Sequence, residues 1–527
     1  MLVVACGGGG GDSTPAPPSV LPLPAGRISV ASPVAAGCTG GSTSGGYFVN
    51  AEVEPFVVAD PAHGNHLVAT WQQDRWTNGG ARAVMTAASF DGGHTWSRTL
   101  QPMSRCAGGT LANGGDYERA TDPWVDIAPD GTVYAMALAF SGASGQASAS
   151  AMLVSRSTDG GVSWSAPVAL IRDGAAFFND KNALTADPHD AHHVYAVWDR
   201  LAGANGPSYF ARSTDGGLSW EAAHAIYTPA SGSQTIGNRI VVLPDGTLAN
   251  FFTQIDTAGG SASAHLDVIR SADKGVTWSA SIRVADLRAV GASDPDTGAP
   301  IRDAGVLASI GVAPDGGLWA TWQDARLSGG QRDAILLSHS GDGGLSWSAP
   351  VGINRNTNVS AFIPTLHVRA DGTVAVMHYD LRDNTADPTT LLADAWLLTS
   401  RDGVAWTETR VWGPFDLAGA PTVDAGRFLG DYQGLTSNGG SFIPVLALSS
   451  TDTSNRTDIY AIELAGLAAR DSASSLGTPV AREATGAASA ALSPEAFRRR
   501  VHENIVRTME RRLPGWSQRM RLDAPPR

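Results

Sequence analysis

Basic side chains, charge in general and long apolar runs are all in short supply in this chain of 527 residues. Only 17% of the residues are charged, lysine is scarce, and the formal net charge is −13. Binding to phosphates needs clustered Lys and Arg, so this composition excludes nucleic acid as the ligand of the main body. Beyond the N-terminus, no stretch approaches the roughly 20 consecutive apolar residues that a membrane-spanning helix requires.

Glycine and tryptophan are abundant, with 61 and 15 copies. Together with the low charge, this composition favours many short strands joined by tight turns over a helical or disordered chain. The sequence therefore predicts an all-β fold.

The N-terminus, residues 1–26, resembles the end of a bacterial lipoprotein signal followed by a Gly- and Pro-rich tether. This resemblance implies export to the cell envelope, on the periplasmic or outer-membrane face, with membrane attachment through a lipid anchor on Cys6. The apolar run before Cys6 is four residues long and has no basic segment ahead of it, so we expect the true start to lie upstream. The alternative is an ordinary cysteine without a lipid.

The remaining cysteines are Cys38 and Cys106. In an exported chain an even pair is expected to form a disulfide, because oxidising compartments preserve such bonds. Neither cysteine has the spacing of a zinc site, and we predict no metal site. No cofactor is expected, and a structural calcium ion is not predicted.

An internal repeat dominates the chain. Six segments share the pattern S-x-D-x-G-x-[ST]-W, the last one residue shorter, and begin 56 to 69 residues apart, the length of a four-stranded unit. They resemble the Asp boxes of sialidase-like propellers, and the resemblance covers roughly residues 50–465. The Asp of each box is expected to bind turn amides rather than to catalyse: Asp91, Asp159, Asp215, Asp273, Asp342 and Asp402.

Between the boxes, apolar hairpins repeat, and seven can be counted against six boxes. We therefore predict one β-propeller over residues 27–466 with seven four-stranded blades, six being the alternative count. A propeller must seal its first blade to its last. Residues 27–34 are expected to supply the outer strand that the last blade lacks.

The end of the chain differs in kind. Residues 467–492 form an Ala- and Ser-rich linker, and residues 493–527 are predicted to form a basic amphipathic helix and tail. Such a helix can lie on an anionic surface or dock on the acidic propeller itself. The sequence leaves both options open.

Candidate site residues stand where the innermost strands begin, because these loops open on the face opposite the Asp boxes. Asp and Arg pairs that recur after the second strands are more easily explained as braces than as a site. Residues that break the repeat are better candidates: Arg239, Arg302, Asp303, Asp431 and Tyr432, followed by Glu118, Arg119, Asp122 and Lys181.

Sialidases of this propeller type hold a substrate carboxylate with arginines and use a tyrosine nucleophile and an aspartate acid. The resemblance implies Arg239 and Arg302 as carboxylate ligands, Tyr432 as the nucleophile, and Asp122 or Asp180 as the acid, with Asp431 and Asp303 as further catalytic candidates. Arg119, Glu118 and Lys181 are candidates for substrate binding. These roles require Arg239, Arg302 and Tyr432 to converge on one pocket.

The sequence thus predicts a monomeric exo-acting glycoside hydrolase that removes terminal, acidic sugars from cell-surface glycans. Two alternatives stay open. One is a propeller that binds a glycan or a protein without turnover. The other is a lyase acting on a uronic-acid polysaccharide, because arginines and a tyrosine can also neutralise a uronate and move a proton.

Overall fold

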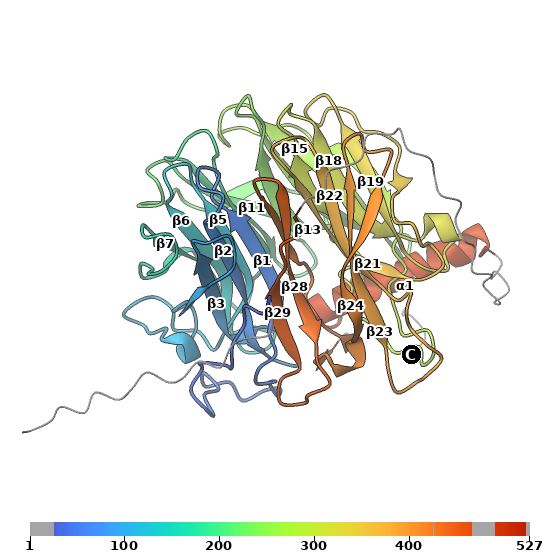
Figure 1. Cartoon of the computed structure of the whole chain (residues 1–527), viewed down its shortest axis with the longest axis horizontal. Coiled ribbons are helices and arrows are strands. Elements are labelled where there is room, and N and C mark those ends of the chain that lie inside the picture. The colour runs from blue at the N-terminus through green and yellow to red at the C-terminus, as the bar shows by residue number, and fades with distance from the viewer. Residues whose placement is uncertain (1–25, 425, 466–490, 523–527) are drawn as a thin grey trace, which may run out of the picture.

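A computed structural model describes residues 26–424, 426–465 and 491–522. The predicted lipidation site, Cys6, and most of the predicted linker lie outside the described residues. The described chain is an all-β, propeller-like assembly with a short helical segment at its C-terminal end (Figure 1).

Successive units of up to four antiparallel strands follow one another along the chain. The first four units contain β1 (Val53–Ala59), β2 (Leu67–Arg75), β3 (Ala81–Ser89), β4 (Ser97–Leu100), β5 (Arg119–Ile127), β6 (Val133–Ser141), β7 (Ala149–Ser157), β8 (Val168–Gly174), β9 (Phe178–Ala186), β10 (Val194–Leu201), β11 (Ser208–Ser213), β12 (His224–Tyr227), β13 (Gln234–Val242), β14 (Leu248–Ala258), β15 (Ser261–Ser271) and β16 (Ile282–Leu287).

The later units contain β17 (Ser309–Val312), β18 (Leu318–Asp324), β19 (Ala334–Ser340), β20 (Val351–Gly352), β21 (Ala361–Val368), β22 (Val374–Asp380), β23 (Leu392–Ser400), β24 (Thr407–Asp416), β27 (Gly434–Asn438), β28 (Ser441–Ser449) and β29 (Thr457–Ala461). The short strands β25 (Thr422–Val423) and β26 (Gly426–Arg427) pair with each other. Three 3₁₀ turns complete the described β region: η1 (Arg105–Ala107), η2 (Arg326–Ser328) and η3 (Leu417–Gly419).

Hydrogen bonding divides the described strands into five sheets of four or more strands, a three-stranded sheet and a two-stranded pair. The first two units share one eight-stranded sheet, because Ala81 in β3 pairs with Ala120 in β5. The last unit has only β27, β28 and β29. The predicted count of seven four-stranded blades is therefore wrong, as is the alternative count of six.

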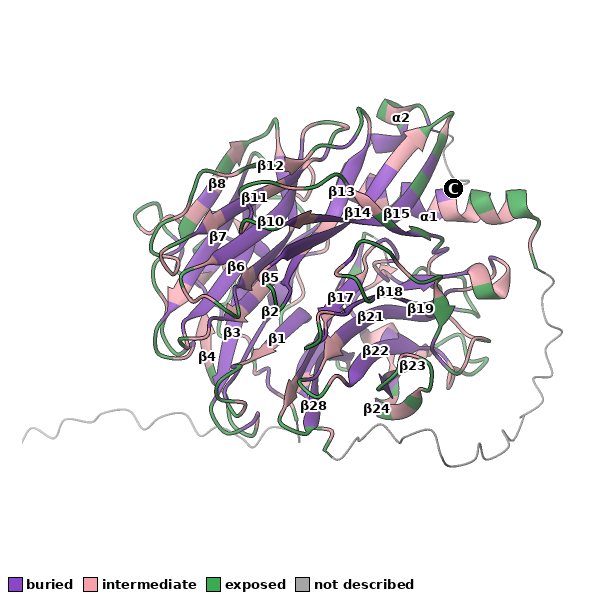
Figure 2. Ribbon diagram, turned by 90° about the horizontal axis from the view of Figure 1, so that it is seen from above, coloured by how far each residue is buried: buried purple, intermediate pink, exposed green. Residues whose placement is uncertain are grey.

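The innermost strands nevertheless close into a ring. Each contacts the innermost strand of the next unit, from β1 through β5, β9, β13, β17 and β21 to β27, and β27 contacts β1 again. Buried residues fill these strands, and exposed residues concentrate in the loops (Figure 2). The ring encloses the channel towards which the starts of the innermost strands point.

The N-terminal segment ties the last unit to the first. Arg27 forms one antiparallel bridge with Tyr460 in β29, and the Ile28 amide donates to the Ile459 carbonyl at 2.8 Å. The outer strand predicted over residues 27–34 thus forms only at its start. The chain then turns towards Cys38, which is bonded to Cys106 in η1.

The Asp boxes form tight turns. In the box that begins at Ser157, this serine donates to Asp159 Oδ1 at 2.7 Å and accepts from the Gly161 amide at 2.8 Å. Asp159 also accepts from the amide and the hydroxyl of Ser163, at 2.9 and 2.5 Å. These hydrogen bonds lower the pKa of Asp159 to about 2. The box is a local device that holds a turn, as the sequence predicts.

Asp159→Ala should lower the free energy of unfolding by about 1–2 kcal/mol, because turn amides lose a charged acceptor. Urea unfolding of the full chain measures this change. Thr158→Ala is the matched control, because Thr158 is exposed in the same turn and should change stability by less than about 0.5 kcal/mol. Equal effects of the two substitutions would show that Asp159 does not hold the turn.

The C-terminal segment contains α1 (Pro494–Arg512) and α2 (Trp516–Met520). Ser493 caps α1 by accepting from the Ala496 amide at 3.2 Å, and proline occupies the first helical turn, as is typical of helix starts. Met509 and Trp516 are buried in the same apolar core as the propeller strands. The predicted helix is therefore docked on the propeller, where it lies across several sheets (Figure 1). Among the described residues, no helix combines the length and the apolar character needed to cross a membrane.

Candidate functional site

A bulge recurs where the innermost strands enter the channel. The β1–β2 register shifts between Val53 and Phe56, and the β5–β6 register shifts between Thr121 and Trp124. In both bulges a residue with positive φ precedes a proline, which has no amide hydrogen to leave unpaired in the ladder. Similar shifts interrupt β9–β10, β13–β14 and β21–β22.

The residues at these bulges share a backbone conformation but differ in charge. The left-handed conformation is adopted by Glu54 (φ 54°), Asp122 (φ 49°), Lys181 (φ 47°), Gly237 (φ 69°) and Ile363 (φ 52°). A non-glycine residue costs about 1–3 kcal/mol in such a conformation, and positions of this kind cluster at functional sites. Among these five residues, only the first three are charged.

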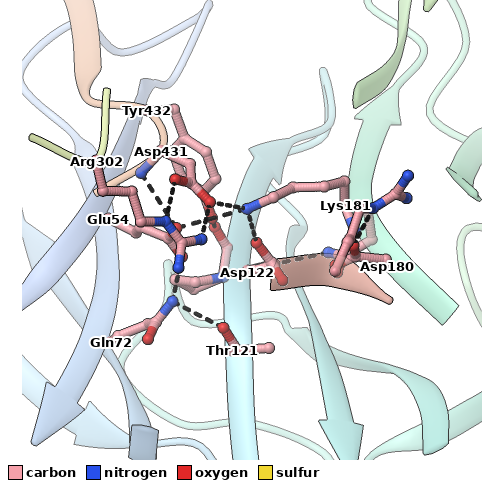
Figure 3. Close-up of polar contacts among 12 residues, drawn as sticks. Glu54, Gln72, Thr121, Asp122, Asp180, Lys181, Arg302, Asp431 and Tyr432 are labelled. Atoms are coloured by element: carbon pink, nitrogen blue, oxygen red, sulfur yellow. Dashed lines mark hydrogen bonds and ion pairs between the residues drawn. The ribbon is translucent and has the colours of Figure 1, made fainter. Parts of the chain in front are cut away.

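Lys181 is the centre of a cluster of charged side chains in the channel (Figure 3). Its ammonium lies 2.7 Å from Asp122 Oδ1, 2.6 Å from Asp431 Oδ2 and 3.5 Å from Glu54 Oε1. Glu54 also accepts from the Asp431 amide at 3.1 Å and from Gln72. Three carboxylates from the first, second and last units therefore surround one cation from the third.

Arg302 completes the cluster from the loop before β17. Its guanidinium binds both oxygens of Asp431, with Nε 2.8 Å from Oδ1 and Nη2 in contact with Oδ2. Burial would raise the pKa of Asp431, but Arg302 and Lys181 hold it well below its usual range. Asp431 is thus a permanently ionised group.

The pKa values of the other two carboxyls, those of Glu54 and Asp122, shift in the opposite direction and are raised. Burial raises the pKa of Glu54 to about 7, because the attraction of Lys181 only partly offsets the loss of water and the nearby Asp122 and Asp431 add to the rise. Burial also raises the pKa of Asp122. Lys181 contacts one oxygen of Asp122, and the second oxygen has no hydrogen-bond partner among the described residues. The cluster therefore contains carboxyls suited to opposite protonation states.

These groups line a cavity of about 600 Å³. Its walls include Glu54, Arg75, Asp122, Lys181, Arg302 and Asp431, and residues of α1 from Arg507 to Arg512 line it as well. This volume is typical of sites for small ligands. The helix therefore faces the charged cluster across the cavity.

Tyr432 and Arg239 do not line this cavity, although the centre of the Tyr432 ring lies 5.8 Å from the Lys181 ammonium. They line a neighbouring cavity of about 70 Å³, which Phe56 and Trp124 share. The Tyr432 hydroxyl donates to the Pro123 carbonyl at 3.1 Å, and burial raises its pKa well above the usual value. The Arg239 guanidinium lies over Trp124, 5.3 Å from the ring centre. Arg302 lines only the larger cavity, so Arg239, Arg302 and Tyr432 do not line a single cavity, as the sialidase resemblance would require.

Other sequence candidates hold loops in place. Arg119 is fully buried and donates to the Gly79 carbonyl at 2.7 Å and to Ser42 Oγ at 2.8 Å. Glu118 accepts from the Gly142 amide at 3.0 Å. Asp303 accepts from the Ala292 amide and from Gln323. None of these three lines either cavity.

The structure brings together Asp122, Lys181, Arg302 and Asp431 from the sequence candidates. It adds Glu54, Gln72, Arg75 and the arginines of α1, which the sequence did not single out as site residues. One sequence signal points to Glu54: Glu54-Pro55 and Asp122-Pro123 repeat the same acidic residue and proline at the start of an innermost strand. In the part of the chain that the structure describes, no group of three or more His, Cys, Asp or Glu is arranged to hold a metal ion.

Comparison with known families gives one match. Residues 208–411 match the BNR repeat-like domain. The match covers four of the six Asp boxes, and the boxes at Ser89 and Ser157 outside it make turn hydrogen bonds of the same kind.

Several solved structures are similar to this chain at low identity. An α-L-arabinanase of Penicillium chrysogenum bound to arabinobiose is 13% identical, with a TM-score of 0.43 over 80% of this chain and 96% of that chain. A mutant of the NanB sialidase of Streptococcus pneumoniae is 12% identical, with a TM-score of 0.41 over 85% and 72%. A protein of unknown function from Dyadobacter fermentans is 14% identical, with a TM-score of 0.42 over 68% and 96%. No curated protein matches the sequence, and these distant similarities do not identify an activity.

Proposed function

We propose that this protein is a glycoside hydrolase that releases a terminal acidic sugar in the cavity beneath α1. The observation that carries the proposal is the placement of Glu54, Asp122 and Lys181 at equivalent bulges beside that cavity. A bulge needs no charge, as Gly237 and Ile363 show at two other positions. Strained, charged residues gathered in a cavity are the arrangement that acid and base catalysis requires.

Two carboxyls have the properties of an acid and a base. Glu54, with a pKa of about 7, is partly protonated at neutral pH and can donate a proton to the departing glycosidic oxygen. Asp122 has one oxygen anchored by Lys181 and one without a protein partner, which can accept a proton from the attacking water. The anomeric carbon then loses its bond to the leaving sugar and gains a bond to the water oxygen.

The ion pairs around this pair set its geometry. Lys181 holds the anchored oxygen of Asp122 at 2.7 Å and favours the ionised form of that carboxyl. Asp431, held by Arg302, keeps the ammonium of Lys181 in place at 2.6 Å. Asp431 and Arg302 are therefore positioning residues in this proposal, and neither is the proton donor.

The helix makes the reaction an exo-acting one. Arg507, Arg511 and Arg512 of α1 line the same cavity as the propeller bulges. A cavity closed by a docked helix accepts the end of a glycan rather than its middle. This supports the release of single terminal residues.

We also propose that the protein acts at the cell envelope. The Cys38–Cys106 disulfide supports export, because such bonds persist in oxidising compartments. An anchor on Cys6 stays a prediction, and labelling with a lipid precursor tests it.

The hydrolase proposal is tested with the purified full chain on fluorogenic sialosides, uronides and arabinofuranosides. Glu54→Gln combined with Asp122→Asn is the inactive reference, because both substitutions keep the shape of the side chain. Release by the parent chain only would support the proposal. Equal signals from both proteins would overturn the proposal and favour a second function, glycan binding without turnover, since Lys181 and Arg302 offset much of the charge of the three carboxylates.

Tyr432→Phe should retain activity within about threefold of the parent, because the hydroxyl is bonded to the Pro123 carbonyl and lines the smaller cavity. Steady-state kinetics on the best substrate of the panel measure this. A loss of about 10³-fold or more would instead identify Tyr432 as the nucleophile of a sialidase-type reaction.

A further inference from the structure

The wall of the cavity formed by α1 carries a cation without a counterion. Arg511 lines the cavity, and no described residue makes a hydrogen bond or an ion pair with its side chain. Its neighbour Arg512 is fully engaged, with Nε 2.6 Å from Asp180 and Nη2 in contact with Asp199. Arg302, another arginine that lines this cavity, donates hydrogen bonds to both carboxylate oxygens of Asp431.

The carboxylates that line the cavity offer Arg511 no ion pair. Glu54, Asp122 and Asp431 surround Lys181, and Asp180 binds Arg512. Glu510 accepts from the amides of Gly515 and Ser517. Asp424 is exposed and lies within 4 Å of no cation among the described residues.

Charged groups near Arg511 also affect its pKa. Burial lowers the pKa of Arg511 to about 10, and repulsion from Arg302 and Arg507 contributes to the shift, which attraction by Asp303 and Asp431 partly offsets. Arg75, on the same cavity, also has its pKa lowered to about 10 by burial and by Arg302, and its Nε is buried without an acceptor. A group of arginines that repel one another in a cavity is stabilised when an anion enters.

The position of Arg511 is fixed by the docking of the helix. Ile505, Val506 and Met509 are buried in the propeller core, and Asn504 donates to the Ala289 carbonyl at 3.2 Å. Arg500 donates to the Gly330 carbonyl at 2.8 Å. These contacts precede Arg511, and the buried Trp516 follows it, so the backbone is held on both sides and loses little conformational freedom when a ligand binds.

We infer that Arg511 binds the carboxylate or sulfate group of an acidic sugar, so that α1 is part of the substrate site of this propeller. The planar guanidinium offers two parallel donors that fit either group. This inference rests on the proposed function for its substrate class, since the cavity is the one in which hydrolysis is proposed. It assigns the choice of acidic over neutral sugars to the C-terminal helix.

Binding to the full chain carrying Glu54→Gln tests the inference without turnover. Titration calorimetry compares glucuronic acid, glucose 6-sulfate and glucose on this chain and on versions that also carry Arg511→Gln, Arg511→Lys or Arg499→Gln. Arg499 is exposed on the same helix and lines no part of this cavity, so its substitution removes the same charge elsewhere. Proteolysis of α1 verifies that the helix stays docked in each variant.

We expect glucuronic acid or glucose 6-sulfate, whichever carries the group that fits Arg511, to bind the parent more tightly than glucose does. The same ligand should bind the Arg511→Gln variant about tenfold more weakly than the parent. Arg511→Lys should recover part of the loss, and Arg499→Gln should change nothing. Equal affinities for glucose and for both acids, an unchanged affinity in Arg511→Gln, or no binding of any probe would overturn the inference. Tight acid binding that depends on Arg511 in a chain that hydrolyses nothing would leave the inference standing while the proposed hydrolysis fails.

Discussion

Glu54→Gln should lower kcat for glycan hydrolysis by about 10²–10⁴-fold, the contribution of a well-placed general acid. Glutamine keeps the shape of the side chain and can still contact Gln72, but it has no proton to give to the leaving group. Single-turnover kinetics with a saturating fluorogenic substrate measure the change without interference from product release.

Glu52→Gln is the matched control for this substitution. Glu52 is buried two residues earlier and is bound to Gln73, yet it does not line the cavity. Its substitution removes a carboxyl from the same segment and should leave kcat within about threefold of the parent. A comparable loss in both variants would mean that the effect comes from the strand and not from a proton at Glu54.

The pH dependence of kcat provides a second test of Glu54 as the general acid. The folded pKa of Glu54 is about 7, above its ordinary value of 4.5, so the proton is present below pH 7 and lost above it. If Glu54 is the acid, kcat should fall about tenfold per pH unit on the alkaline side of pH 7. This limb should disappear in Glu54→Gln, whereas persistence of the limb would assign it to another group.

Arg512→Met should weaken the docking of α1 by about 3–5 kcal/mol, because it leaves Asp180 and Asp199 as buried charges without a partner. Methionine retains most of the apolar stem, so the loss reports on the charge. Hydrogen exchange of the helix amides, together with proteolysis of the C-terminal segment, measures the population of undocked helix.

Two further variants make this result interpretable. Asp180→Asn and Asp199→Asn, added to Arg512→Met, should recover much of the docking because the uncompensated charges are gone. Arg499→Met, on the exposed side of α1, should leave exchange unchanged. Unchanged protection in Arg512→Met would show that Met509, Trp516 and their apolar neighbours dock the helix without this ion pair.

Features encoded within a few residues were predictable. Each Asp box closes its turn with bonds that span at most four residues, as between Ser157 and Gly161, so the pattern alone predicts the turn. The period of the boxes predicts the propeller for the same reason. Helix α1 was predictable because its cap, Ser493-Pro494, and its apolar period are local.

Features that depend on pairing between units were not predictable in the same way. The fusion of the first two units depends on a single bridge between Ala81 and Ala120, which no repeat pattern marks. The channel site depends on residues nearly 380 positions apart, such as Glu54 and Asp431.

The pair Asp431-Tyr432 illustrates the same limit. The two residues are adjacent in sequence, but Asp431 lies at the edge of both cavities while Tyr432 lines only the smaller one. Neighbouring side chains on an extended segment point to opposite sides, and a bulge changes which side that is. The sequence could therefore predict that this segment faces the channel, but not the direction in which each of its side chains points.

The sequence by itself determined the all-β class, the Asp-box turns, the position of the C-terminal helix along the chain and the segments that face the channel. Only the tertiary structure decided that Glu54, Asp122, Lys181 and Asp431 meet, that Tyr432 lines the neighbouring smaller cavity, and that α1 lines the larger one. The reason is physical: a turn or a helix is specified by hydrogen bonds between near neighbours, whereas a charged cluster is specified by the closure of a ring of strands that brings distant residues to one place.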